Sequence, residues 1–199
     1  MIGFDLFVEL VTYYFVMFVT PGPNNAMMTA SGIRYGFKKT IPHMVGIPSG
    51  HIIQIASICL GLGIIFQKFP QLQDGLKWIG TAYLFYLAWK MIGSFDNKKD
   101  SSARPLKFHE GALFQIVNPK AWVIATNATV LFFPQNTNIF LAVPFMCITA
   151  FFVCLPCISI WALFGSQIRK FLGNTKFKMT VEIIMAGLLI LTGILILKG

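Results

Sequence analysis

An interruption rich in proline and asparagine lies inside the first long apolar stretch of the chain, at Pro21, Gly22, Pro23, Asn24 and Asn25. Each proline lacks a backbone donor and clashes with the preceding turn, so a helix is expected to break there. A half-helix that starts after Pro23 would present unpaired N–H groups and the positive end of its dipole, which suit a carboxylate. Carbonyl groups released by the prolines can accept from an ammonium, and the asparagines add amide donors. The pattern therefore predicts a polar site that suits both a carboxylate and an ammonium, at the kind of broken helix where membrane transporters hold their substrates.

A second interruption, at Asn118, Pro119 and Lys120, is expected to match the first one from a later helix. Asn118 would contribute another amide to the same site. Lys120 lies inside an apolar run, where a cation needs a carboxylate, a cavity or a neutral state. Two alternatives stay open: the asparagines only cap broken helix ends, and the Lys120 side chain extends along the broken helix to the cytoplasmic surface.

Two titratable residues are candidates for carrying a coupled proton, His51 and Glu9. His51 is a candidate because an imidazole ordinarily titrates near neutral pH, and the alternative for it is a neutral side chain bonded to a helix carbonyl. Glu9 precedes the first break by about three helical turns. It would load protons from outside or simply lie at the outer interface of the membrane. We predict His51 rather than Glu9, because His51 lies deeper and beside the Pro48–Gly50 stretch.

Other reactive side chains have simpler explanations. Cys154 and Cys157 form a C-x-x-C pair without a charged neighbour to activate a thiol, so packing is expected and redox chemistry is the alternative. Gly46, Gly50 and Gly61 form a stripe of small residues that is expected to pack closely against another helix. The sequence contains no nucleophile triad, phosphate loop or metal motif, so it supports neither an enzyme nor a cofactor or metal site.

Composition places the chain in a membrane. It is 56% hydrophobic with a mean hydropathy of +0.70, and 12% of its residues are charged, about half the charged fraction of a soluble domain. The net charge of +9 comes from basic residues spread over the connections between apolar runs, so nucleic acid is not an expected partner. The start of the chain lacks a basic stretch and a small-residue cleavage site, so no removable signal peptide is expected.

Six apolar runs are long enough to cross a bilayer, because a crossing needs about 20 residues. We therefore expect an all-α membrane protein with six transmembrane helices, of which the first and the fourth are broken. Trp78 and Trp89 flank the third run as interfacial anchors would. The six runs are Phe4–Ala30, Ile41–Phe66, Leu76–Phe95, Gly111–Phe133, Ile139–Gly165 and Val181–Leu197.

The polar segment 97–110 is a natural linker between two halves of a single membrane domain, residues 1–96 and 111–199, with three helices each. Halves with an odd number of helices have opposite topology, which predicts the inverted repeat common among secondary transporters. The first, third and fifth connections hold 11 Lys and Arg residues, against 3 in the other connections and the C-terminus. By the positive-inside rule, the odd connections are cytoplasmic and both termini lie outside.

Short motifs along nearly the whole chain carry a resemblance to a known family. They are Thr20–Asn25, Gly32–Gly36, Asn118–Lys120, Trp161–Gly165, Trp78–Lys90 and Phe133–Thr137. The first four resemble the lysine exporter/homoserine-threonine exporter (LysE/RhtB) family, and the last two are similar in particular to its cysteine/O-acetylserine exporter branch. The resemblance implies six helices and export of amino acids or their derivatives, driven by the proton or ion gradient. Cys154 and Cys157 are not part of that family pattern.

Together these features predict a secondary transporter that exports small neutral amino acids, such as cysteine or O-acetylserine, across the bacterial cytoplasmic (inner) membrane with coupling to protons. The expected partners are the amino acid, protons or ions and the lipid bilayer, and a homodimer is left open. One alternative is a membrane thiol-electron carrier that uses Cys154 and Cys157. Another is an ion or metal exporter on the same fold, for which the sequence lacks a His- or Cys-rich cytoplasmic loop.

Reporter fusions test the orientation. A reporter placed at Lys98 should lie in the cytoplasm and one at Gly199 outside, because of the 11 to 3 distribution of Lys and Arg. A cytoplasmic signal from Gly199 would contradict either the number of spans or their orientation.

Overall fold

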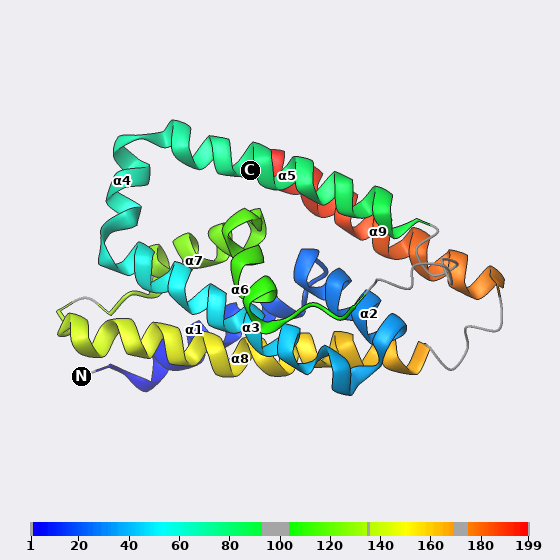
Figure 1. The fold of residues 1–199 in the computed structure, drawn as a ribbon. Coiled ribbons are helices and arrows are strands. Elements are labelled where there is room, and N and C mark those ends of the chain that lie inside the picture. The colour runs from blue at the N-terminus through cyan, green and yellow to red at the C-terminus, as the bar shows by residue number, and fades with distance from the viewer. Residues whose placement is uncertain (1, 93–103, 135, 169–174, 199) are drawn as a thin grey trace.

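The computed structural model describes residues 2–92, 104–134, 136–168 and 175–198, which form helices joined by short loops and contain no strand (Figure 1). The helices are α1 (Phe4–Val19), α2 (Pro23–Tyr35), α3 (Phe37–Ser57), a π-helical segment (Ile58–Leu62), α4 (Gly63–Lys68), α5 (Pro70–Met91), α6 (Phe108–Val117), α7 (Pro119–Phe132), α8 (Ile139–Ile168) and α9 (Thr175–Lys198). The expectation of an all-α fold is therefore confirmed for the described residues.

Both expected helix breaks are present. The first apolar run forms α1 and α2, which meet at an angle of 55°, and the fourth forms α6 and α7. Proline occupies the first turn of both α2 and α7, where its missing N–H costs nothing and its fixed φ suits a helix start. Helix α6 begins at Phe108, inside the segment predicted as a linker, and residues 97–103 of that linker lie outside the described part of the chain.

Length and apolar composition identify the membrane-crossing candidates among the described residues. Three helical stretches qualify, Phe37–Ile65, Ile139–Ile168 and Met179–Lys198, and the bent pair of α1 and α2 qualifies as a fourth. The third and fourth predicted runs, whose described residues fold as α5 and as the pair of α6 and α7, are not among these candidates. The count of six spans and the inverted repeat therefore remain predictions.

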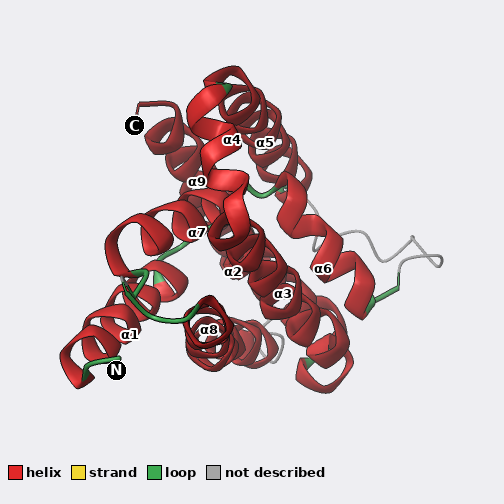
Figure 2. Cartoon of the chain, turned by 90° about the vertical axis from the view of Figure 1, so that its left-hand side faces the viewer, coloured by secondary structure: helices red, strands yellow, loops and turns green. Residues whose placement is uncertain are grey.

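The helices pack as a bundle with a separate pair along one side. Helices α5 and α9 lie antiparallel against each other and form that pair (Figures 1 and 2). In the bundle, α8 packs against α1, α2 and α3, while α3 also packs against α6. The two broken helices thus pack against different neighbours. Helices α1 and α2 pack against α8, and α6 packs against α3, which brings both breaks toward the middle of the bundle.

Small residues allow α3 and α6 to approach backbone to backbone. A Cβ added at Gly46 would collide with the carbonyl of Phe108, and one added at Gly50 would collide with the carbonyl of Ala112. The predicted close packing of this glycine stripe is therefore confirmed for Gly46 and Gly50. Gly61 instead has a φ of 123° in the π-helical segment and no neighbour within 4 Å of an added Cβ, so it serves the kink rather than the packing.

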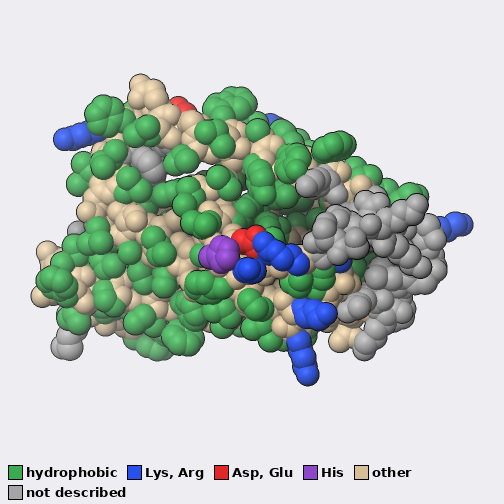
Figure 3. All heavy atoms as spheres, viewed as in Figure 1, with side chains coloured by type: hydrophobic (Ala, Val, Ile, Leu, Met, Phe, Trp, Pro, Cys, Tyr) green, Lys and Arg blue, Asp and Glu red, His purple; other side chains and the backbone are tan. Residues whose placement is uncertain are grey.

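Large apolar side chains cover the outside of the bundle. Hydrophobic groups dominate the face shown in Figure 3, and Phe140, Trp89 and Phe152 are exposed by 82%, 71% and 69%. Trp78, the other predicted anchor, is exposed by 64%. A soluble monomer rarely exposes so continuous an apolar surface, whereas a lipid-facing surface requires one.

Substitution of Gly50 tests the contact between α3 and α6. Gly50→Ala should lower the stability of the purified protein in detergent by about 1–3 kcal/mol, because the added methyl overpacks a backbone contact. The matched control is Gly187→Ala, where an added Cβ meets nothing within 4 Å, so its melting temperature should be no lower than that of the wild type. Equal melting temperatures for Gly50→Ala and wild type would contradict the close approach.

Candidate functional site

The starts of α2 and α7 meet at a small cavity of about 20 Å³. That volume holds about one water molecule. The cavity gathers seven of the predicted site residues from two half-helices and from α3. They are Gly22, Pro23, Asn24, Asn25, His51, Asn118 and Lys120. The remaining lining comes from α1, α7 and α8 and is mostly apolar, with Cys154 as its thiol.

The remaining predicted residues flank the cavity or lie away from it. The carbonyl of Pro21 accepts a hydrogen bond from Lys120 (3.1 Å). Pro119 begins α7 and packs against α5, because a Cβ on Gly80 would lie only 2.6 Å from its Cδ. Glu9 is exposed on α1 and does not line the cavity.

Side chains from other segments satisfy the carbonyls released at the end of α1. The amide nitrogen of Asn25 donates to the carbonyls of Phe18 (3.0 Å) and Thr20 (2.7 Å). The indole N–H of Trp161, on α8, donates to the carbonyl of Val19 (3.2 Å). Asn25 therefore has a structural role as a cap, which is the alternative that the sequence left open for the asparagines.

The ammonium of Lys120 lies against the break in the first helix. Its Nζ donates to the carbonyl of Thr20 (2.8 Å), the hydroxyl of Thr20 (2.9 Å) and the carbonyl of Pro21 (3.1 Å). Gly22 leaves room for this side chain, because a Cβ there would lie 2.8 Å from Lys120 Cδ. The Lys120 side chain thus points across the bundle instead of along its own helix to the surface. It also occupies acceptors that the sequence suggested for the ammonium of a cargo molecule.

Gln115 joins the two breaks, and sequence reasoning missed it. Its side chain and that of Asn24 donate to each other, over 3.0 and 3.1 Å, and the amide nitrogen of Asn118 donates to Gln115 Oε1 (3.3 Å). The side chain of Gln54, on α3, donates to the Gln115 backbone carbonyl (2.7 Å). The signal that could have found Gln115 is its place four residues before Pro119, where proline frees a helical carbonyl.

The network leaves two hydrogen-bond acceptors without a partner on residues that line the cavity. Because Gln54 donates through its nitrogen, its Oε1 accepts from His51 Nδ1 (3.2 Å), which places the imidazole proton on Nδ1 and a lone pair on Nε2. His51 Nε2 and Asn118 Oδ1 are buried and have no partner within the described residues. Both residues line the cavity, so an arriving donor would find two acceptors there.

A larger chamber of about 710 Å³ adjoins the small cavity between α1, α7 and α9. Its walls are mostly apolar, with Thr20, Thr126, Asn127 and Thr192 as polar groups. Met17 and Lys120 line both spaces. The Lys120 side chain consequently lies at the boundary between a water-sized cavity and a chamber large enough for a small molecule.

An all-helical chain with a lipid-facing exterior and two broken helices around a polar cavity has the features of a membrane transporter. The family model described as LysE type translocator matches residues 15–199. The chain therefore belongs to the LysE type translocator family, a family of transporters and not of enzymes.

Similar proteins in bacteria carry the name cysteine/O-acetylserine efflux protein. The relatives from Escherichia coli (strain K12) and Shigella sonnei (strain Ss046) are 29% identical over 128 residues, and the one from Escherichia coli O1:K1 / APEC is 28% identical over 128 residues. Each alignment covers 64% of this chain and 65% of the relative, so the chain matches less than two thirds of the length of these curated relatives. No solved structure matches the chain.

Proposed function

We propose that this protein exports small neutral amino acids, with cysteine and O-acetylserine as the first candidates, across the bacterial inner membrane. The observation that carries the proposal is the meeting of two half-helix N-termini, one ammonium and two unpaired acceptors at one cavity. The names of the relatives support the same class of cargo. The proposed arrangement is six spans in two inverted halves with both termini outside.

The carboxylate of the cargo would bind between Lys120 and the starts of α2 and α7. Because proline has no N–H, the first free backbone donors of these two helices belong to Asn24 and Lys120. Both helix dipoles direct their positive ends at the cavity, and Lys120 adds a full charge. An anionic group is therefore the ligand that this end of the site favours.

The ammonium of the cargo would bind to the acceptors on the other side of the cavity. Asn118 Oδ1 and His51 Nε2 are both unpaired within the described residues, and neither carries a formal charge when the histidine is neutral. An ammonium supplies up to three donors, so it can pair with both acceptors at once. The same two atoms would not be satisfied by a simple carboxylic acid, which gives the site a preference for amino acids.

The cavity has to widen before an amino acid can enter. A volume of about 20 Å³ admits one water, whereas a free amino acid is several times larger. Proline lies inside α3 at Pro48 and inside α8 at Pro156, close to the cavity residues His51 and Cys154. Each proline removes one helical hydrogen bond, so these helices can bend there at low cost.

Transport by purified protein in liposomes tests the site. Asn118→Ala should weaken labelled cysteine binding roughly ten- to a hundredfold, since it removes the Oδ1 acceptor for the cargo ammonium. Asn24→Ala should weaken it to a similar degree, because it breaks the two hydrogen bonds with Gln115 that fix the start of α2 at the cavity. Gln71→Ala is the matched control, because Gln71 is an exposed amide of α5 that does not line the cavity. Wild-type affinity and uptake in both asparagine variants would rule out the site.

Proton coupling through His51 is a separate part of the proposal. His51→Gln should abolish accumulation driven by an imposed pH gradient and spare downhill exchange. Exchange requires no net proton movement, and the glutamine oxygen still offers an acceptor to the cargo ammonium. The exposed His109 provides the control substitution His109→Gln. If His51→Gln accumulates cargo as the wild type does, His51 is a structural histidine and the proton moves elsewhere.

A further inference from the structure

A second polar pocket, of about 250 Å³, lies between α2, α3 and the segment before α6. It shares no lining residue with the cavity at the helix breaks. Its walls include Met27, Ser31, Arg34, His43, Arg104 and Leu106. At about 30 Å³ for each water, this volume has room for roughly eight water-sized groups, which matches a small amino acid.

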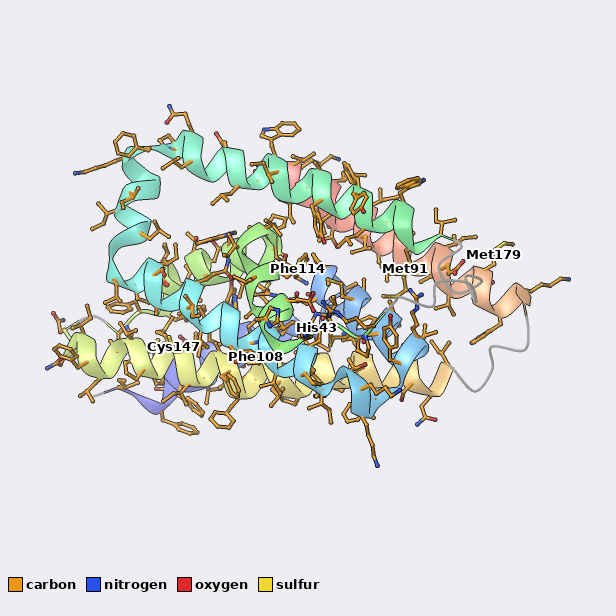
Figure 4. All side chains as sticks on the ribbon, viewed as in Figure 1. His43, Met91, Phe108, Phe114, Cys147 and Met179 are labelled. Carbon is orange, nitrogen blue, oxygen red and sulfur yellow. The ribbon has the colours of Figure 1, made fainter. Side chains whose placement is uncertain are left out.

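His43 is the unusual residue of this pocket. Its side chain is completely buried, and neither ring nitrogen has a hydrogen-bond partner within the described residues. Figure 4 shows it inside the bundle between α3 and its neighbours. The ring is closely packed against α6, because a Cβ on Gly111 would lie 2.6 Å from His43 Cδ2. A buried polar group without a partner is costly, so a hydrogen-bonding ligand in the pocket would stabilise it.

Arg34 supplies the positive charge of the pocket. Arg104 is already neutralised, because its guanidinium donates to both oxygens of Glu110 (2.6 and 2.8 Å). That hydrogen bonding lowers the pKa of Glu110 to about 2, so the carboxylate stays ionised at neutral pH. Arg34 packs over the Tyr35 ring at 5.6 Å and makes no ion pair within the described part of the chain. An anion entering the pocket would therefore meet an unneutralised guanidinium.

One face of α2 connects this pocket to the cavity at the breaks. Asn24, which lines the cavity, is followed at helical spacing by Met27, Ser31 and Arg34, which line the pocket. Residues three and four apart lie on the same face of a helix. Ten residues of helix separate Asn24 from Arg34 by about 15 Å along the axis. The two spaces therefore follow one another along a single helix face.

We infer that the Arg34–His43 pocket is an entrance site that binds the carboxylate of the amino acid before it reaches the cavity. Arg34 pairs with the carboxylate, and His43 makes a hydrogen bond to the same ligand. The inference rests on the proposed function, since it assumes that the cargo is an amino acid. It adds a second cargo-binding site, located at the end of α2 that carries Arg34.

Equilibrium binding to the full-length protein in uncharged detergent micelles tests this inference. Labelled cysteine under reducing conditions should bind with two equivalents to the wild type. In Arg34→Gln, one equivalent should keep its affinity and the other should bind roughly tenfold more weakly. Arg34→Lys should keep the second equivalent at intermediate affinity, because lysine retains the charge and loses the planar fork. Lys38→Gln removes an exposed charge outside the pocket and should keep both equivalents.

The other outcomes distinguish the two proposals. Asn118→Ala should weaken the equivalent that Arg34→Gln leaves unchanged, and failure of that variant alone to do so counts against the cavity rather than the entrance. A single equivalent in the wild type that Arg34→Gln leaves unchanged, or equal losses in Arg34→Gln and Lys38→Gln, overturns the entrance site. A single equivalent that Arg34→Gln weakens counts against the cavity. The last measurement is competition by added phosphatidylglycerol. If this lipid displaces one bound cysteine when the two are present in equimolar amounts, the pocket is a site for lipid phosphate and the inference is overturned.

Discussion

The structure depends on pairing the backbone carbonyls that the prolines at the two helix breaks release inside the bundle. A proline at position i frees the carbonyl of residue i−4, and in hydrocarbon an unpaired carbonyl costs several kcal/mol. Pro21, Pro23 and Pro119 would free the carbonyls of Met17, Val19 and Gln115. All three have donors: Thr20 Oγ1 at 3.0 Å, Trp161 Nε1 at 3.2 Å and Gln54 Nε2 at 2.7 Å, respectively.

Two of these three donors come from helices distant in sequence, so the breaks can exist only in the assembled bundle. Trp161 belongs to α8 and Gln54 to α3, the two helices against which the broken segments pack. Lys120 adds a third long-range donor, from α7 to the end of α1. The same contacts that hold the helices together thus keep their broken ends away from lipid, and they concentrate polar groups at the point where cargo would bind.

The sequence predicted where the helices break because proline acts locally. It predicted the polar residues at the breaks because the asparagines and Lys120 are neighbours of those prolines. It did not predict Gln115, whose role depends on the rotation of α6 toward Asn24. It also did not predict the acceptors of Lys120, because these lie about 100 residues away in the chain. The pocket around Arg34 and His43 brings together three separate segments, so no local spacing could reveal it.

The start of α6 at Phe108 was missed for a related reason. A polar run resembles a linker until Glu110 is seen to accept from the Lys107 N–H (2.7 Å) as part of a helix cap.

Lys120 connects the closed geometry of the cavity with the proposed cargo. Its ammonium is held against the first break by the carbonyls of Thr20 and Pro21 and by the hydroxyl of Thr20. Under the proposed function, the cargo carboxylate competes with these oxygens for Lys120, while the cargo ammonium pairs with Asn118 Oδ1 and His51 Nε2. A cargo without an ammonium would leave those two acceptors unpaired, at a cost of about 1–3 kcal/mol. Because Lys120 also borders the larger chamber beside α9, its departure from the carbonyls would join the two spaces. The carboxylate that draws Lys120 away from the carbonyls would therefore also open a route for the cargo out of the cavity.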